Sequence, residues 1–236
     1  MVFIRAENLY SFLKINLPKN SSSFFTFSFL VLLFYLPHTR AEDKSIVTKT
    51  TSLKKMVFLG DSLTEGYGVD ASSTYTHLLQ EKFENNKIHW NVVNAGISGS
   101  TTASAVSRIN WILKGNIKPD LFIIILGAND GLRGQKVSGV KKNLSDSIDI
   151  LLQQKIPVIL GQVQVPPNYG KEYSESFKNI YPQLAKEKKI PLMPFILEKV
   201  AGVPELNIED GIHPNEKGHK IIFEQVFKYL EKEKKL

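Results

Sequence analysis

The chain has 236 residues, of which 42% are hydrophobic, 10% aromatic and 22% charged. This is the composition of an ordinary globular protein, so wholesale disorder and low-complexity sequence are excluded. The chain has no cysteine, which excludes disulfides, cysteine-bound zinc, iron–sulfur clusters and a thiol nucleophile. Its net charge of +7 is not gathered with aromatic residues into one basic cluster, so we expect no nucleic acid among its partners.

Residues 1–41 carry the pattern of an export signal. Residues 24–36 form an unbroken apolar run, which is shorter than the roughly 20 residues that span a bilayer but has the length of the apolar region of a signal peptide. We expect cleavage near Ala41 and a periplasmic or secreted protein. The alternative is an uncleaved N-terminal anchor, which would then be the contact with a membrane. The polar residues 42–55 read as a linker, and residues 56–236 as one folded domain.

From residue 56 onward, apolar runs that predict strands alternate with apolar stripes that predict helices. In chain order we expect strands at 56–59, around a core at 92–93, at 121–126, at 156–160 and at 190–195. After each strand we expect a helix, and the apolar faces of these helices are Tyr75 to Phe83, Val106 to Leu113, Val137 to Leu151, Phe177 to Leu184 and Ile222 to Leu230. Ser72 or Ser73 is the expected N-cap of the first helix, and Thr101 that of the second. The alternation predicts a three-layer α/β/α fold, with a parallel sheet between helices, and its prolines place the last strand at an edge.

The polar and glycine-rich segments of the chain follow these strands. They are residues 60–63, 94–100, 127–130 and 162–167, and residues 210–214 lie on a further loop before the last helix. In an open parallel sheet, ligands bind beyond the carboxyl ends of the strands. We therefore expect these five segments to converge in space and to form a site.

The residues in these segments suit nucleophilic catalysis. A serine hydroxyl needs a base to take its proton and a third group to orient that base. Ser62 lies on a tight turn after a glycine, His213 is the candidate base, and Asp210 is placed to accept a hydrogen bond from its Nδ1. The backbone N–H groups of Ser62 and Gly99 and the side-chain amide of Asn129 are the candidate donors to an oxyanion. Glycine is expected at 99 because a side chain there would crowd the substrate carbonyl.

Four blocks in this order resemble the signature of the SGNH, or GDSL, hydrolases. They are Gly-Asp-Ser-Leu at 60–63, Gly99, Gly-Ala-Asn-Asp at 127–130 and Asp-Gly-Ile-His-Pro at 210–214. Residues 127–134 and 167–170 are also similar to the branch of thioesterase I, protease I, lysophospholipase and arylesterase. The likeness extends over about residues 56–221, and Ala128 stands where many members carry glycine.

The resemblance implies a five-stranded flavodoxin-like sheet, the SGNH hydrolase fold, over residues 56–236. It implies a serine esterase that hydrolyses carboxylic esters, and acyl thioesters or lysophospholipids, through an acyl-enzyme. Ser62 would be the nucleophile, His213 the base and Asp210 its orienting group, with the oxyanion donors named above. The residues expected to line the acyl pocket are Gln162, Pro167 and Tyr169. No cofactor or metal is implied, and the expected partner is a small-molecule acyl ester or thioester, bound by a monomer or small oligomer.

Several neighbouring residues invite other interpretations. Glu209 competes with Asp210 as the orienting acid, and the family spacing favours Asp210. Asp61 is expected to hydrogen-bond within the turn, and Asp130 to serve as a loop or helix-capping residue. His219 lies six residues after the candidate base and inside a predicted helix, so we expect no metal-binding histidine pair.

Three other classes of function fit the sequence less well. Residues 66–71 match the G-x-G-x-x-G/A pattern of dinucleotide-binding proteins, but they begin six residues after the first strand, and the second strand lacks the acidic residue that would hold a ribose. An α/β-hydrolase would need G-x-S-x-G, and residues 60–64 lack the second glycine. A non-catalytic flavodoxin-like binding module has no need for a serine, an aspartate–histidine pair and oxyanion donors at one edge.

Overall fold

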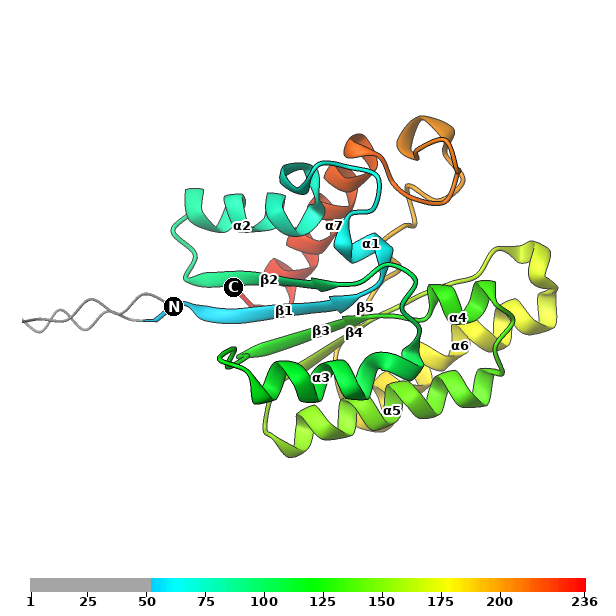
Figure 1. Cartoon of the computed structure of the whole chain (residues 1–236), viewed down its shortest axis with the longest axis horizontal. Helices are drawn as coiled ribbons and strands as arrows, with labels where there is room; N and C mark the ends of the chain where they lie inside the picture. The colour runs from blue at the N-terminus through cyan, green and yellow to red at the C-terminus, as the bar shows by residue number, and fades with distance from the viewer. Residues whose placement is uncertain (1–51) are drawn as a thin grey trace, which may run out of the picture. The chain divides into compact units, whose positions relative to one another are not determined.

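The computed structural model describes residues 52–236, so the expected export signal at 1–41 and most of the expected linker lie outside the described residues. A five-stranded sheet forms the centre of this part of the chain (Figure 1). Its strands are β1 Lys54–Gly60, β2 Trp90–Gly96, β3 Leu121–Ile125, β4 Val158–Gly161 and β5 Leu192–Met193. All neighbours pair in parallel, in the order β2-β1-β3-β4-β5. This is the flavodoxin-like order, and the predicted parallel sheet is confirmed.

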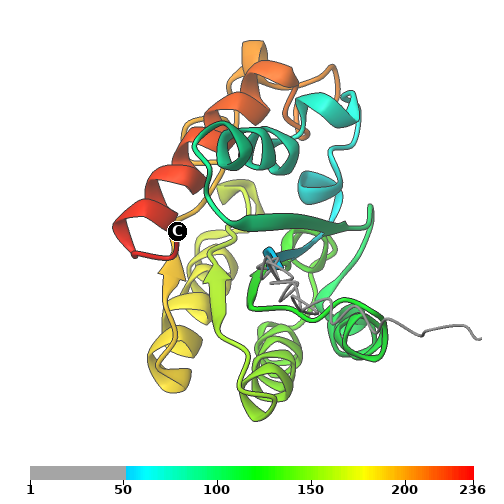
Figure 2. The same ribbon diagram turned by 90° about the vertical axis from the view of Figure 1, so that its left-hand side faces the viewer.

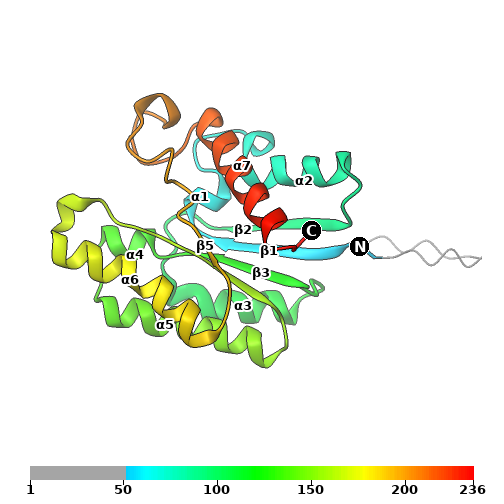
Figure 3. The ribbon, with the colours of Figure 1, turned by 180° about the vertical axis from the view of Figure 1, so that it is seen from behind.

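Helices cover both faces of the sheet, as the alternating pattern predicts (Figures 1, 2 and 3). On one face lie α2 Tyr75–Asn85 and α7 Glu216–Lys232, and on the other lie α3 Ala105–Lys114, α5 Val137–Gln153 and α6 Lys171–Lys188. The central strand β3 is buried along its whole length, because helices shield it on both sides. Within residues 52–236 there is no helix long and apolar enough to cross a bilayer.

Short helical segments in the connections between the strands and the long helices are the main features that the hydrophobic pattern does not predict. They are the α-helices α1 Ser62–Glu65 and α4 Ala128–Leu132 and the 3₁₀ turns η1 Ala71–Ser73, η2 Thr102–Ser104, η3 Pro167–Tyr169 and η4 Pro204–Leu206. A segment of three to five residues is too short to repeat an apolar stripe. The strands also differ in extent from the expectation. β1 begins two residues earlier and β4 two residues later than expected, β2 extends over Trp90–Gly96, and β5 has only two residues.

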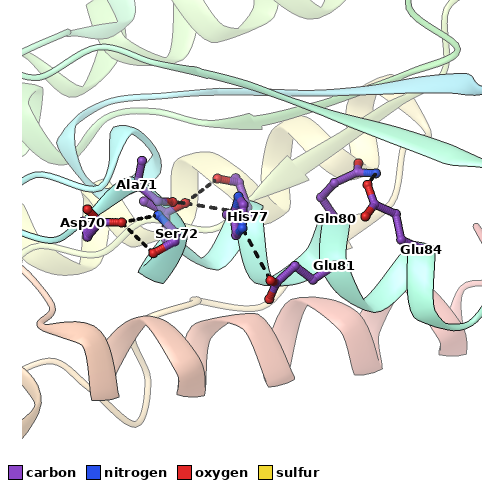
Figure 4. Close-up of polar contacts among 9 residues, drawn as sticks. Asp70, Ala71, Ser72, His77, Gln80, Glu81 and Glu84 are labelled. Atoms are coloured by element: carbon purple, nitrogen blue, oxygen red, sulfur yellow. Dashed lines mark hydrogen bonds and ion pairs between the residues drawn. The ribbon is translucent and has the colours of Figure 1, made fainter.

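The expected helix caps are wrong in both cases. Thr74, not Ser72 or Ser73, caps α2, because its hydroxyl accepts the N–H of His77 at 3.3 Å. Ser72 belongs to the preceding turn, where its N–H and hydroxyl donate to Asp70 Oδ1 at 2.8 and 2.5 Å (Figure 4). Thr101 precedes η2 and makes no side-chain cap bond among the described residues. In both places a 3₁₀ turn separates the expected cap from the α-helix.

Polar pairs lie along α2 (Figure 4). His77 Nε2 lies 3.6 Å from Glu81 Oε1, and Gln80 Nε2 donates to Glu84 Oε1 at 2.8 Å. Gln80 also accepts the N–H of Val92 at 2.7 Å, which ties the helix to β2. These contacts are structural and account for His77 without a catalytic role.

Candidate active site

Three residues predicted from the sequence form a continuous hydrogen-bonded relay. Ser62 is the first residue of α1, directly beyond the end of β1. Its Oγ lies 2.8 Å from Nε2 of His213, and Nδ1 of His213 lies 2.6 Å from Oδ2 of Asp210. Only Asp210 of the two candidate acids contacts the imidazole in the described loop. The arrangement has the connectivity of a serine–histidine–aspartate triad.

The turn that carries Ser62 is held from both ends. Asp61 caps α1 by accepting the N–H of Leu63 at 3.1 Å, and Gly66 ends the helix in the left-handed region with a φ of 91°. A Cβ on Gly60 would collide with the side chain of Thr64, so the tight turn requires glycine there. Asp61 is only 2% exposed. Burial raises the pKa of this carboxyl to about 6, while the Leu63 N–H and the nearby Arg108 act in the opposite direction. The expected structural role of Asp61 agrees with this geometry.

Asp210 is kept in its ionised form by the loop around it. Its Oδ1 accepts the backbone N–H groups of Ile212 at 2.8 Å and of His213 at 2.9 Å. Partial desolvation disfavours the charge, but the backbone and side-chain hydrogen bonds outweigh it and lower the pKa of Asp210 to about 2. The carboxylate is therefore charged at neutral pH, where it can hold the imidazole with Nδ1 protonated.

The loop that carries the histidine is tied to the start of α7. Asn215 caps α7 by accepting the N–H groups of Lys217 and Gly218 at 3.0 and 3.1 Å. The amide of Asn215 also donates to the carbonyls of Glu205 and Asn207 at 2.9 and 3.2 Å. These bonds place residues 207–214 at the carboxyl edge of the sheet, which is where the return loop was expected.

The three expected oxyanion donors lie on loops that contact one another. Residues 97–100 form a turn in which Ser100 N donates to Ile97 O at 3.2 Å. Gly99 has a φ of 74°, and Asn129 Nδ2 donates to Ser100 O at 3.0 Å. The backbone N–H groups of Ser62 and Gly99 have no acceptor within residues 52–236. These two donors therefore remain available to a substrate oxygen.

The need for glycine at 99 has a conformational reason. The atom nearest to a Cβ built on Gly99 would be Arg133 Nη2, at 3.8 Å, so the protein leaves room for a side chain. A φ of 74° is, however, strained for residues other than glycine. Besides the expected crowding of the substrate, the backbone conformation at position 99 is therefore itself a reason for glycine.

Sequence reasoning missed several contacts that hold the loops together. Arg108 of α3 donates through Nη1 to Gly60 O at 2.9 Å and through Nη2 to Ala95 O, so it joins the ends of β1 and β2. The ring of Tyr67 packs 4.8 Å from that of His213. An arginine on an amphipathic helix and a tyrosine in a loop resemble ordinary surface residues, so the pattern gives no signal for either.

Asp130 and Glu65 bind neighbouring loops instead of their own helices. Asp130 accepts the N–H and the hydroxyl of Thr102 at 2.8 and 2.7 Å, which caps η2 from a distance. Glu65 accepts the N–H of Ser98 at 2.7 Å and also its hydroxyl. The sequence suggested the capping role of Asp130 but not its partner, and it gave no indication for Glu65.

Gln162 and Tyr169, two of the residues expected in an acyl pocket, hold their loop through different contacts. Gln162 N donates to Met193 O at 2.9 Å and so continues the pairing of β4 with β5. Tyr169 is 38% exposed and donates to Leu132 O at 3.0 Å. The side chain of Pro167 lies outside the described part of the chain. A cavity of about 770 Å³ between α5 and α6 is lined by Tyr169 but by neither Gln162 nor Ser62 among the described residues.

His219 is engaged in the core and does not pair with His213. Its Nδ1 accepts the N–H of Tyr75 at 3.3 Å, and the rings of Tyr75 and His219 stack 6.2 Å apart. Burial lowers the pKa of His219 to about 4. Across residues 52–236, no three potential metal ligands gather into a cluster.

Comparison with known proteins gives the family. The GDSL-like Lipase/Acylhydrolase family model matches residues 58–221. The chain is 40% identical over 179 residues to an arylesterase of Vibrio mimicus, which covers 76% of this chain and 89% of that protein. It is 35% identical over 205 residues to thioesterase 1/protease 1/lysophospholipase L1 of Escherichia coli, covering 87% of this chain and 90% of that protein. The chain belongs to the GDSL-like lipase/acylhydrolase family.

The solved structure of an esterase has the same fold. The psychrotrophic esterase EstA from Pseudoalteromonas, inhibited by monoethylphosphonate, matches with a TM-score of 0.74 and 31% identity, covering 78% of this chain and all of that one. The three-layer fold predicted from the sequence is confirmed. The chain is a serine ester hydrolase, and the alternative of a non-catalytic binding module is not favoured.

Proposed function

We propose that the protein hydrolyses carboxylic esters through an acyl-enzyme formed on Ser62, with His213 as the base and Asp210 as its orienting group. The observation that carries the proposal is the relay in which Ser62 Oγ, the imidazole and the carboxylate are joined by contacts of 2.8 and 2.6 Å. In this arrangement Nδ1 of the imidazole donates to Asp210, which leaves the Nε2 lone pair directed at the serine hydroxyl.

In the proposed reaction, His213 carries a proton from Ser62 to the leaving group. When Ser62 Oγ attacks the acyl carbon, His213 Nε2 takes the hydroxyl proton, and the charged Asp210 stabilises the resulting imidazolium. The same Nε2 then returns the proton to the leaving alkoxide or thiolate as its bond to the acyl carbon breaks. A water molecule, deprotonated by the same base, releases the acid from Ser62. No step calls for a metal or an organic cofactor.

We assign the oxyanion donors to Ser62 N, Gly99 N and Asn129 Nδ2. The negative charge develops on the carbonyl oxygen only when the acyl carbon becomes tetrahedral. Donors fixed in advance therefore stabilise the transition state more than the bound ester. Loss of one such donor typically lowers kcat by about 10²–10³.

The substrate class that we propose is acyl esters together with acyl thioesters and lysophospholipids. The names of the relatives support this range, since one is an arylesterase and another combines thioesterase and lysophospholipase activity. We assign the acyl side of the site to the loop that carries Gln162, Pro167 and Tyr169, because it follows β4 at the same sheet edge. The apolar run at 24–36 supports a periplasmic or secreted location.

The test is the Ser62→Ala variant of the purified protein. We expect it to lose hydrolysis of p-nitrophenyl acyl esters and to unfold in urea like the parent. A fluorophosphonate should label the parent at Ser62, as mapped by mass spectrometry, and should leave the variant unlabelled. Hydrolysis by the variant at the parent's rate would overturn the proposal.

A further inference from the structure

We propose that Glu65 is a positioning residue that orients the Gly99 N–H toward the oxyanion by holding Ser98. The inference rests on the proposed function, because it assumes that Gly99 N donates to the oxyanion. Glu65 Oε2 accepts the N–H of Ser98 at 2.7 Å and also accepts the Ser98 hydroxyl. Both donors of the residue before Gly99 are thus held by one carboxylate oxygen.

Glu65 and the nucleophile share a single turn of helix. The helix α1 begins at Ser62 and ends at Glu65, and Gly66 then leaves it in the left-handed region. Residues three apart lie on neighbouring positions of a helix surface. A carboxylate at Glu65 can therefore reach from the helix that carries Ser62 to the loop that carries Gly99.

The turn at 97–100 explains why the direction of the Gly99 N–H has to be controlled. Ser98 has a negative φ and Gly99 a φ of 74°, and Ser100 N donates back to Ile97 O at 3.2 Å. A positive φ at the third position only is the signature of a type II turn. A type I turn closes the same hydrogen bond with the central peptide rotated by roughly half a turn. The Gly99 N–H belongs to that central peptide, so a change of turn type would direct it away from the site.

The other contacts of the loop do not fix the orientation of the peptide between Ser98 and Gly99. Ile97 N donates to Gly60 O at 3.3 Å, and a Cβ on Gly96 would collide with the backbone of Glu65, so the start of the loop is fixed. Asn129 and Arg133 donate to the carbonyls of Ser100 and Gly99, at 3.0 and 3.2 Å, beyond the central peptide. Glu65 is the contact on the Ser98 side of the peptide, where a charged acceptor makes the stronger hydrogen bond.

The first experiment compares Glu65→Ala with Glu65→Gln in the purified protein. For Glu65→Ala we expect kcat to fall about tenfold, less than the roughly 10²–10³ lost with a whole donor, because part of the population keeps the type II turn. KM should change less than twofold, since the donor acts on the transition state. The carbonyl oxygen of Glu65→Gln can accept both bonds, so this variant should recover kcat to within about threefold of the parent.

A matched control separates positioning from a general effect of removing a glutamate. Glu81 is exposed on α2 and contacts His77 on its outer surface (Figure 4), so Glu81→Ala should leave kcat, KM and the urea midpoint unchanged. A trifluoromethyl ketone supplies a second measurement, because its adduct with Ser62 places an oxyanion in the site. Its affinity should fall in Glu65→Ala by the same factor as kcat.

The proposal is overturned if kcat of Glu65→Ala stays within twofold of the parent, if the loss lies entirely in KM, or if Glu65→Gln is as impaired as Glu65→Ala. Should Glu65→Ala fail to fold, Ser98→Ala decides: it removes the hydroxyl bond alone, and kcat should fall by a factor of about three, whereas no loss would contradict the inference. Activity that survives Ser62→Ala would overturn the proposed function itself. If Ser62→Ala is inactive and Glu65→Ala keeps the kcat of the parent, only the role of Glu65 is overturned.

Discussion

His213 Nε2 lies 2.8 Å from Ser62 Oγ, although 151 positions separate the two residues. Direct packing between their loops maintains this short distance. The ring of Tyr67 lies 4.8 Å from the imidazole, and a Cβ on Gly68 would come within 2.7 Å of Ile208 Cδ1. The segment after the nucleophile thus rests on the segment before the base. The triad depends on this contact as well as on the sheet.

Asp210→Asn should lower kcat by about 10²–10⁴ with little change in folding, because an amide does not enforce the Nδ1-protonated imidazole or stabilise the imidazolium. Steady-state kinetics with a p-nitrophenyl ester measures the loss. Glu209→Gln is the matched control, since Glu209 is the adjacent acid and is exposed. If Glu209→Gln is the inactive variant and Asp210→Asn the active one, the orienting acid is misassigned.

Asn129→Ala should lower kcat by about 10²–10³ if its amide donates to the oxyanion. The variant also loses the bond from Asn129 Nδ2 to Ser100 O, so kcat should be read beside the urea midpoint. Asn110→Ala, an exposed position on α3, should match the parent in both measurements. A loss of less than threefold in Asn129→Ala would assign the residue a structural role only.

Asp61→Asn should make the protein's stability less sensitive to pH between 4 and 7. The pKa of Asp61 is raised by burial to about 6 in the folded state, so its stabilising contribution is complete below pH 4 and is lost as the pH rises through 6. A shift of about two units corresponds to roughly 2–3 kcal/mol. Asparagine keeps the cap on α1 without the charge. The free energy of unfolding in urea should therefore rise for the variant relative to the parent from pH 4 to pH 7. A difference in unfolding free energy that stays constant over this range would contradict the prediction.

His219→Gln should raise the stability relative to the parent toward acid pH, whereas Asp61→Asn does so toward neutral pH. Burial lowers the pKa of His219 to about 4 from an ordinary 6.5, so the unfolded chain binds a proton first as the pH falls. The stability present above pH 6.5 is lost as the pH drops through 4, by about 3 kcal/mol for a shift of this size. Glutamine cannot be protonated, so the variant should gain on the parent toward acid pH. Equal slopes in urea unfolding between pH 7 and pH 4 would rule out this contribution.

The strands and the long helices could be predicted because their periodicity is a direct result of burial. The run at 121–126 has to be apolar throughout since β3 is covered on both faces, and the stripe from Val137 to Leu151 matches the buried face of α5. The order of the polar segments along the chain then predicts which loops meet, since parallel strands end at one edge. Ser62, Asp210 and His213 are brought together for this reason.

The parts that could not be predicted depend on contacts between loops. Whether Thr74 or Ser72 caps α2 depends on the preceding 3₁₀ turn, because serine and threonine are both good N-cap residues. The reach of Glu65 to Ser98 and of Arg108 to the carbonyl of Gly60 requires knowing where one loop lies relative to another. Neither hydrophobic periodicity nor residue preference contains that information.

The two bonding directions of Asn215 have a mechanical consequence. Its oxygen belongs to the first turn of α7, while its amide holds the carbonyls of Glu205 and Asn207. Asn215 lies two positions after His213, so the position of the imidazole is coupled to the N-terminal end of a 17-residue helix. A shift of α7 along its axis would therefore change the distance between His213 Nε2 and Ser62 Oγ. Mutations in the packing of α7 against α2 can in this way alter proton transfer from a distance.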